Sequence, residues 1–419
     1  MNKSSDMIRN RAGFGFSAFK NLSGKLPNLF PRIMGPNAMK YLQEVIESGL
    51  ESDMVERFET VFKEKMGMRY CVSAPGCSNA IYSLAEAMQL KPGDEVVVSS
   101  VSDYGTIMGF CKMGVIPVFA DTAKNSINVC AETIEACITE KTRAIMVVHM
   151  TGLVCDMDPI LSVAEKYHLP VIEDVCQAIM STYKGRLAGT LGYASSFSFD
   201  SEKIMGSDIG ACYLTNDQEL YDFANFFCLS RAGTMKPGYG RMYVMPGIAM
   251  RMPQCTAAVN LAQLELLDSN VKILDKQIRY LYKLLSSIDG ISVELPKDYQ
   301  SVFACWMGVF RVDLSKFDCT LDEFCKECVE MGFTGLGALK YYLLPESCTF
   351  LADNAAEGNF PYMKPFTEKE YDYRCNLYPN AVEYLSNALR WATFSERYTE
   401  KDCDLVYDIV KTVATRHYR

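Results

Sequence analysis

Histidine is scarce in this chain, and its scarcity bears on metal binding. Three histidines occur among 419 residues, and the 17 cysteines are scattered along the chain. The one close cysteine pair, Cys325 and Cys328, has no second pair at the spacing of a zinc site. The cysteine number is odd and the chain is long, unlike a short secreted protein with a disulfide framework. We therefore expect reduced thiols and no metal site.

The sequence also lacks long apolar runs and a surplus of basic charge. Residues Met1 to Lys25 contain no apolar stretch of signal-peptide length, and no later run is long enough to cross a membrane. The chain has 42 basic and 51 acidic residues, and this net charge of −9 disfavours general binding to nucleic acid or anionic membranes. These absences predict a cytoplasmic protein without a nucleic-acid or membrane partner. Any phosphate that it binds must be held by local groups.

The first half of the chain has the pattern of an α/β domain. Apolar residues make up 49% of a chain that is long enough for two domains of unequal size. Short β-branched runs alternate with segments of helical period, which predicts a mostly parallel, seven-stranded sheet. The expected strands are Tyr70–Ala74, Glu95–Ser100, Val115–Ala120, Arg143–His149, Pro170–Asp174, Ser195–Phe199 and Ala211–Thr215. The expected helices are Ser78–Gln89, Thr106–Lys112, Glu132–Ile138, Pro159–Tyr167 and Glu219–Leu229.

The remainder of the chain predicts a smaller α+β domain. A long helical stretch from Pro253 to Ser287 is expected to link the two domains. It is followed by strand residues within Val302–Val312, a helix at Leu321–Met331, an irregular stretch from Gly332 to Pro379 and a closing helix at Glu400–His417. We expect an N-terminal segment over residues 1–44 that packs on the small domain, a large domain over 45–270 and a small domain over 271–419.

Asp174 and Lys203 are the most informative pair of residues. Asp174 ends an apolar strand, so its carboxylate is expected at the carboxyl edge of the sheet, where open α/β folds bind ligands. Lys203 follows the next strand and turn. Pyridoxal phosphate (PLP) chemistry requires an amine that forms an imine with the cofactor aldehyde and a carboxylate that keeps the pyridine nitrogen protonated. The pair therefore indicates a PLP site, whereas an isolated Asp174 would more simply cap a helix.

The turn after the first expected strand is a candidate phosphate site. Gly76 permits close approach, and Cys77 and Ser78 offer backbone N–H groups at a helix N-terminus. The alternative for this segment is an ordinary strand-to-helix turn. Ser198 adds a hydroxyl at a strand end, and Gln177 lies just beyond the expected strand at Pro170–Asp174, within reach of the same ligand.

A series of short segments, taken in order, resembles the DegT/DnrJ/EryC1/StrS sugar aminotransferases. The matching segments are Lys91–Val98, Val118–Asp121, Thr142–His149, Cys155–Asp158, Ile172–Ala178, Tyr183–Thr190, Ser196–Phe199 with Lys203, Gly247–Arg251 and Ala257–Leu264. They cover roughly residues 40 to 270. The resemblance implies the aspartate-aminotransferase type of PLP-transferase fold, with a large seven-stranded domain and a smaller α+β C-terminal domain.

The resemblance also implies a homodimeric, PLP-dependent transaminase. Such enzymes usually take an amino group from glutamate or glutamine and place it on a keto-sugar, often nucleotide-linked, in amino-sugar, surface-polysaccharide or natural-product biosynthesis. The roles that it implies are a Schiff base at Lys203, a pyridinium partner at Asp174, a ring-hydroxyl contact at Gln177, phosphate contacts at Gly76, Cys77 and Ser198, and Arg251 lent to the partner subunit.

Several positions depart from the family pattern. The usual Ser-Gly-Thr phosphate turn is Pro75-Gly76-Cys77 here, which shifts a hydroxyl contact to Ser78. Asp103 stands where the family has an aromatic ring against the cofactor, and Tyr104 is the nearest ring, so both are candidate cofactor contacts. Ala249 replaces an asparagine that usually reaches the partner's phosphate. These changes concern the affinity for the cofactor more than its identity.

Three alternatives remain open at this point. The segments around Asp174 and Lys203 also look like the branch that aminates carbon 8 of the octulosonate sugar Kdo. A PLP-dependent sugar dehydratase is a second alternative, but such dehydratases usually carry histidine where this chain has Lys203. The third is a weakly active paralogue that binds the cofactor for regulation, which the departures at Cys77, Asp103 and Ala249 suggest.

Overall fold

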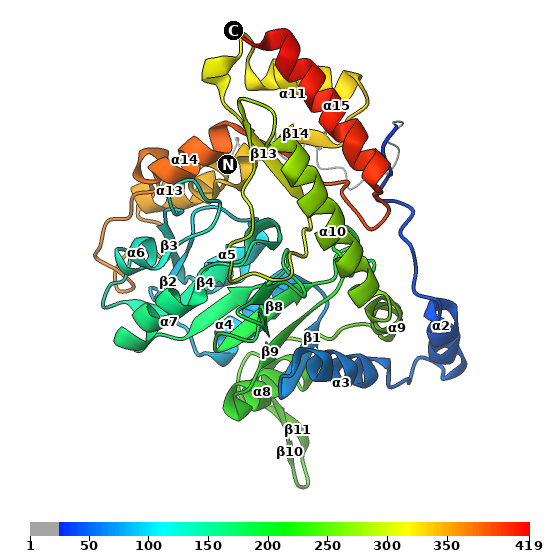
Figure 1. Cartoon of the computed structure of the whole chain (residues 1–419). Helices are drawn as coiled ribbons and strands as arrows, with labels where there is room; N and C mark the ends of the chain where they lie inside the picture. The colour runs from blue at the N-terminus through cyan, green and yellow to red at the C-terminus, as the bar shows by residue number, and fades with distance from the viewer. Residues whose placement is uncertain (1–24) are drawn as a thin grey trace, which may run out of the picture.

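The structure is a computed structural model that describes residues 25–419. Figure 1 shows a large central sheet flanked by helices and, above it, a smaller unit built on a second sheet. The expected N-terminal segment is described only from residue 25 onward, and its first 24 residues lie outside the described part. No helix within residues 25–419 combines the length and apolar character needed to cross a membrane.

The large sheet contains all seven expected strands. They are β1 (Tyr70–Ala74), β2 (Glu95–Ser99), β3 (Ile116–Ala120), β4 (Thr142–Val148), β5 (Val171–Asp174), β8 (Ala194–Ser198) and β9 (Ala211–Thr215). Their order is β1-β9-β8-β5-β4-β2-β3, and β9 alone runs antiparallel to both of its neighbours. Every residue of β2 and of β9 is buried, as expected for a sheet that is covered on both faces. The predicted α/β fold class is therefore confirmed.

Helices cover both faces of this sheet. The five expected helices correspond to α4 (Cys77–Ala87), α5 (Gly105–Met113), α6 (Ala131–Glu135), α7 (Met157–Lys166) and α8 (Gln218–Ala224), the last of which continues as a π-helical turn, η2 (Asn225–Leu229). Two further helices, α2 (Ala38–Glu47) and α3 (Met54–Met66), were not predicted. Phe58, Phe62 and Met66 recur every four residues on the buried side of α3, so helical periodicity was present there.

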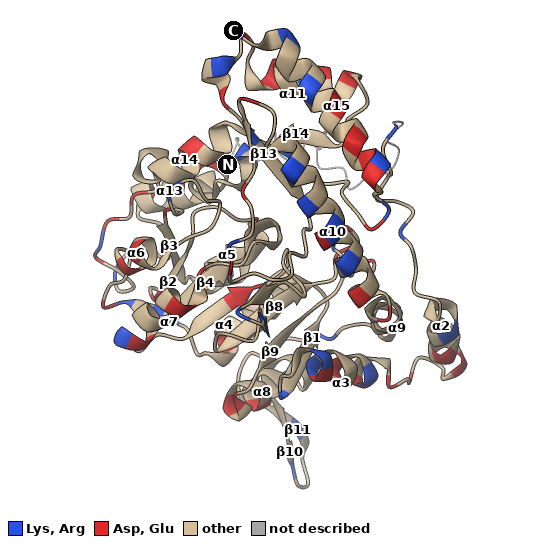
Figure 2. Ribbon diagram, viewed as in Figure 1, with Lys and Arg blue, Asp and Glu red and all other residues tan. Residues whose placement is uncertain are grey.

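The link between the two units is a pair of helices. The single helical stretch expected over Pro253–Ser287 is broken into α9 (Gln254–Leu264) and α10 (Leu267–Leu285). Figure 1 shows α10 running from the large sheet to the small unit beside α15 (Glu400–His417). Lysine and arginine positions alternate with acidic positions along these outer helices, whereas the central strands are mostly uncharged (Figure 2).

The small unit is an antiparallel four-stranded sheet covered by helices. Its strands are β12 (Ile291–Ser292), β13 (Gly308–Val312), β15 (Ala388–Trp391) and β14 (Leu336–Ala338), in that spatial order, with α11 (Leu321–Glu330) packed on α15. Only residues 308–312 of the expected strand region pair. The expected irregular stretch contains β14 and the helices α12 (Leu344–Ser347) and α13 (Thr349–Glu357), and α14 (Pro379–Ser386) follows.

The chain from about residue 340 to 381 returns to the large sheet. Lys369 Nζ and Tyr371 Oη both donate to Glu95 Oε1 at the start of β2, at 2.9 and 2.7 Å. The backbone N–H groups of Asn380 and Ala381 donate to the Asp121 carboxylate just beyond β3. The segment therefore joins the small unit to the edge of the large one.

Two hairpins complete the described fold. β6 (Thr182–Tyr183) pairs with β7 (Arg186–Leu187) beside the core, and β10 (Gly233–Lys236) pairs with β11 (Gly240–Tyr243). The β10–β11 hairpin projects away from the body of the molecule (Figure 1). Its Met235 and Tyr239 side chains are highly exposed.

Candidate active site

A cavity of about 450 Å³ lies at the carboxyl edge of the parallel strands. Its walls come from the turns that follow β1, β2, β5 and β8, and from residues of the small unit such as Trp306, Tyr341 and Arg390. Eight of the residues singled out from the sequence line it: Gly76, Cys77, Ser78, Asp103, Asp174, Gln177, Ser198 and Lys203. The topology thus brings together groups that are far apart in the chain.

Asp174 presents a fixed carboxylate to this cavity. It is the last residue of β5 and is almost fully buried. Its Oδ2 accepts a hydrogen bond of 2.7 Å from Thr106 Oγ1, which is itself 2.7 Å from Ser102 Oγ. Its Oδ1 accepts one of 3.0 Å from the backbone N–H of Cys176. These bonds fix the orientation of a buried carboxylate, which favours a cationic partner in the cavity.

Lys203 lies in the turn after β8, and two distant segments hold that turn in place. Its Nζ is 3.7 Å from the centroid of the Trp306 ring, a cation–π contact. Trp306 Nε1 donates to the carbonyl oxygen of Glu202 at 2.8 Å. From the N-terminal segment, Arg32 Nη2 donates to the carbonyl oxygens of Lys203 and Ile204 at 2.8 and 3.0 Å. Arg32 and Trp306, from two distant segments of the chain, therefore both hold the turn that carries Lys203.

The start of α4 supplies the candidate phosphate site. Gly76 precedes the helix, and Cys77 and Ser78 are its first two residues. The first N–H groups of a helix have no partner within the helix and point toward an anion placed at its end. A Cβ atom at position 76 would lie 3.4 Å from Asn79 Oδ1 and 3.6 Å from the Ile209 side chain, which is ordinary van der Waals contact, so sterics alone do not require glycine there.

Of the other residues singled out from the sequence, Gln177 and Asp103 line the cavity, whereas Tyr104 and Arg251 do not. Gln177 is buried, and its Oε1 accepts from the backbone N–H of Thr151 at 2.8 Å. Asp103 lines the cavity, and its Oδ1 accepts from the N–H of Gly105. The ring of Tyr104 does not line the cavity, because it packs edge-on against Phe350 of α13. Arg251 is exposed and does not line the cavity of its own chain.

Sequence reasoning missed several residues of this site. Thr106, which donates a hydrogen bond to Asp174, lies at the start of an expected helix, and nothing else in the sequence around it indicates a role in the site. Trp306 is one of only two tryptophans in the chain, and this rarity was the available signal. Nothing near Arg32 in the sequence indicates that it contacts a turn 171 residues away.

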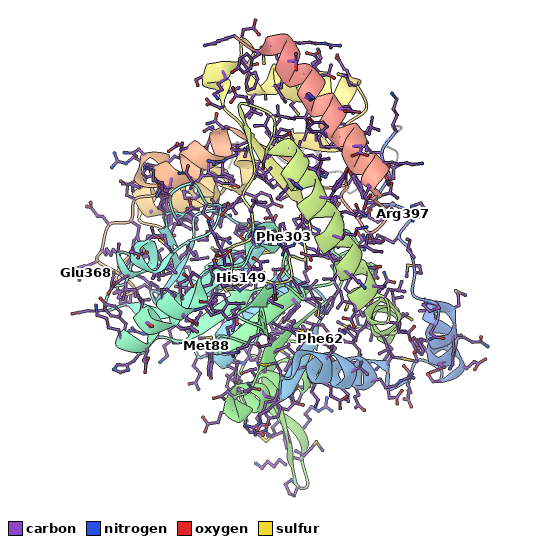
Figure 3. All side chains as sticks on the ribbon, in the orientation of Figure 1. Phe62, Met88, His149, Phe303, Glu368 and Arg397 are labelled. Atoms are coloured by element: carbon purple, nitrogen blue, oxygen red, sulfur yellow. The ribbon has the colours of Figure 1, made fainter. Side chains whose placement is uncertain are left out.

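Glu173, the neighbour of Asp174, has a structural role instead. It is fully buried and accepts three backbone hydrogen bonds of 2.7 Å, from Gly189, Leu191 and Gly192, together with one of 3.0 Å from His149 Nε2. His149 is labelled in the interior in Figure 3. Burial alone would raise the pKa of Glu173, but the hydrogen bonds outweigh burial and lower that pKa below its ordinary value. Glu173 therefore ties the 189–192 turn to the sheet.

The chemical groups that line the cavity fit PLP. A buried carboxylate suits a protonated pyridine nitrogen, an amine suits an aldehyde, and a helix N-terminus suits a phosphate. All three kinds of group line one cavity.

Comparison with known proteins defines the class of enzyme first. The putative sugar aminotransferase Spr1654 from Streptococcus pneumoniae, in its PLP form, has the same fold, with a TM-score of 0.80 at 18% identity over 94% of this chain and 99% of that chain. Residues 33–370 match the DegT/DnrJ/EryC1/StrS aminotransferase family. The protein belongs to this family and is a PLP-dependent aminotransferase, which confirms the resemblance seen in the sequence.

Two relatives of established name illustrate the family. The spore coat polysaccharide biosynthesis protein SpsC of Bacillus subtilis is 29% identical over 401 residues, which is 92% of this chain and 97% of that protein. GDP-perosamine synthase of Caulobacter vibrioides is 33% identical over 305 residues, or 72% of this chain and 81% of that protein.

Proposed function

We propose that this aminotransferase moves an amino group from glutamate or glutamine to the carbonyl carbon of a keto-sugar, either free or nucleotide-linked. We place it in the cytoplasm, in the synthesis of an amino sugar for a surface polysaccharide or a natural product. The observation that carries the proposal is that Asp174 and Lys203 line the same cavity. The names of the relatives, GDP-perosamine synthase among them, support the sugar as the amino acceptor.

In this proposal the groups that line the cavity divide the binding of PLP between them. Lys203 would attach covalently to its aldehyde, and Asp174 would face the ring nitrogen. The start of α4 and Ser198 would hold its phosphate, and Gln177 would contact its ring hydroxyl. When bound, PLP supplies the electron sink that lets a proton leave the carbon bearing the amino group.

The residues of the chain handle the protons. Asp174, fixed by Thr106 and the N–H of Cys176, stabilises the positive charge of a protonated ring nitrogen. Lys203 would act through Nζ as a general base and acid, taking a proton from the substrate carbon and returning it during the transfer. The Trp306 ring beneath Nζ limits where the amine can go. Because amino transfer with this cofactor requires such an amine, a lysine at this position favours that reaction.

The proposed assembly is a homodimer in which each subunit completes the site of the other. Arg251 is exposed and stands outside the cavity of its own chain, which suits a residue that acts across an interface. Its guanidinium would clamp the carboxylate of the amino donor through two parallel hydrogen bonds.

The test begins with the cofactor and Lys203. The purified protein should have a visible absorbance band that glutamate or glutamine removes, and borohydride should fix the cofactor to Lys203, as mass spectrometry of the digest would show. A Lys203→Ala variant should keep its circular dichroism spectrum and lose turnover. A Lys184→Ala variant is the matched control, since that lysine is exposed and paired with Asp158 on the surface. Turnover that survives in Lys203→Ala contradicts the proposal.

Nitrogen labelling identifies the donor and the reaction. Amino-labelled glutamate and glutamine, supplied separately with candidate keto-sugars, should pass the label to the sugar. A sugar product that loses water and gains no label would indicate a dehydratase instead.

A further inference from the structure

Two cysteine thiols meet inside the candidate cofactor cavity. Cys77 is the first residue of α4, and Cys176 lies two positions after Asp174. Their Sγ atoms are 3.0 Å apart, and both residues are half-buried and line the cavity. A disulfide bond is about 2.05 Å long, so the two sulfur atoms need to approach by roughly 1 Å to become bonded.

Other described cysteines lack one part of this arrangement. Cys71 and Cys212 are hydrogen-bonded neighbours, but both are buried in the large sheet and neither lines this cavity. Cys255 is exposed but does not line the cavity. Cys77 and Cys176 combine close approach with access from a cavity.

We propose that Cys77 and Cys176 form a modification site, at which hydrogen peroxide oxidises the two thiols to an intramolecular disulfide. In the first step the Cys77 sulfur gives up its proton and attacks a peroxide oxygen. The S–O bond forms, the O–O bond breaks, and the leaving oxygen takes up a proton as water. In the second step the Cys176 sulfur attacks Cys77, so that the S–S bond forms, the S–O bond breaks and hydroxide leaves with the Cys176 proton as a second water.

The order of the two steps follows from the surroundings of Cys176. Burial, together with the hydrogen bond to Cys77 and the nearby Asp174 charge, raises the pKa of the Cys176 thiol well above its ordinary value. Cys176 is therefore the poorer first nucleophile and acts as the resolving thiol.

The disulfide has a consequence for the cofactor, and this consequence rests on the proposed function. It would tie the start of α4, the candidate phosphate site, to the segment that follows Asp174. A displacement of about 1 Å in a positioned site is enough to cost roughly a hundredfold in function. We expect the oxidised protein to hold PLP at least tenfold more weakly than the reduced protein, and bound PLP to slow the oxidation by covering the cavity wall.

The first experiment detects the bond itself. The full-length protein is treated with hydrogen peroxide, alkylated and digested with trypsin without reduction. The fragment between Arg69 and Lys112, which holds Cys77, should be joined to the fragment between Lys166 and Lys184, which holds Cys176. A thiol reductant should separate the two fragments.

Serine variants assign the link to its two cysteines. Cys71 and Cys111 share the Cys77 fragment, so Cys71→Ser and Cys111→Ser are matched controls that should keep the link. Cys77→Ser and Cys176→Ser should abolish it. A link that persists in Cys77→Ser, or peroxide treatment that yields sulfinic acid at Cys77 without any link, would overturn the proposal.

The second experiment measures the cofactor separately. PLP retention is followed by absorbance in reduced and oxidised protein, and Cys176→Ser should keep its cofactor under peroxide. A link that forms without loss of PLP contradicts the consequence and leaves the modification site in place. A link that forms in a protein unable to bind PLP at all refutes the proposed function alone.

Discussion

Two adjacent carboxylates on β5 have opposite tasks. Successive side chains of a strand point to opposite faces, so Glu173 and Asp174 cannot share surroundings. Glu173 accepts four hydrogen bonds, three of them from the backbone of one turn. Its carboxylate therefore holds that turn against the sheet. Asp174 receives two and lines the cavity. The same carboxylate chemistry thus serves the fold at one position and, in the proposed function, a ligand at the next.

The first prediction at the residue scale concerns the support of Asp174. Asp174→Ala should retain part of the cofactor and lower kcat by about a thousandfold or more, because nothing then stabilises the ring charge. Thr106→Val removes one hydrogen bond to this carboxylate, worth about 1 kcal/mol or slightly more, and should lower kcat by roughly tenfold. Steady-state kinetics checks both, with the surface variant Asp158→Ala as the control. Equal losses in the two buried variants would contradict this ordering.

The second residue-scale prediction concerns Glu173 and pH. Because the folded pKa of Glu173 is lower than its unfolded value, its ionised form stabilises the fold above the ordinary glutamate pKa of about 4.3. That contribution is lost as the pH falls through the lower, folded pKa. Glu173→Gln should reduce the free energy of unfolding by about 3 to 5 kcal/mol near neutral pH.

The pH series is the sharper measurement for Glu173. Urea denaturation between about pH 6 and pH 3 should show a smaller loss of stability on acidification in Glu173→Gln than in the wild-type protein. An identical slope in the two proteins would show that Glu173 does not carry the linkage.

At the scale of elements, the sequence predicts the large sheet well for a physical reason. Strands of a sheet that is covered on both faces are short and largely apolar, and each of the seven was recognisable within one residue of its ends, although β8 contains three serines. The small unit was less predictable, since β14 and β15 are short and gain their stability from pairing across distant residues. The break between α9 and α10 was missed because the apolar period continues through Glu265 and Leu266.

The candidate site divides in the same way. Residues at strand ends and at the start of α4, such as Asp174 and Gly76, follow from local pattern. Arg32 and Trp306 reach the Lys203 turn across 171 and 104 positions of the chain, and only the packed fold brings them there. Tyr104 was selected for its ring, but the covering Phe350 of α13 holds that ring away from the cavity.

The element-scale prediction concerns the turn that carries Lys203. Arg32→Ala removes the hydrogen bonds to the carbonyl oxygens of Lys203 and Ile204, so amide hydrogen exchange across residues 200–207 should become faster. PLP affinity should fall by roughly tenfold to a hundredfold, since two bonds to a charged group are lost and each is worth about 1.5 kcal/mol or more. Arg69→Ala, at an exposed arginine remote from the cavity, is the control. Unchanged exchange in Arg32→Ala would refute this positioning role.

At the scale of the whole molecule, the projecting β10–β11 hairpin and Arg251 both lie outside the cavity of their own chain. A twofold dimer is the commonest assembly among soluble homo-oligomers, and the proposed interface would cover exposed apolar side chains such as Met235 and Tyr239.

Subunit mixing tests the proposed shared site directly. Lys203→Ala and Arg251→Ala proteins should each be nearly inactive alone. In a mixed dimer, one site combines Lys203 of one subunit with the partner subunit's Arg251, so activity should recover to about half of the wild-type value per mixed dimer. Mixtures that stay inactive, although mass spectrometry detects the mixed dimer, would show that Arg251 does not act across the interface.

The return of the C-terminal segment to the large sheet also determines when that sheet becomes fully stable during translation. A ribosome releases Glu95 long before Lys369 and Tyr371, which follow 274 and 276 residues later. Until they emerge, the carboxylate at the start of β2 is without two of its partners, and its entry into the sheet is costly. The large sheet of the nascent chain therefore reaches its final stability only when nearly the whole polypeptide has been translated, although its seven strands are complete by residue 215.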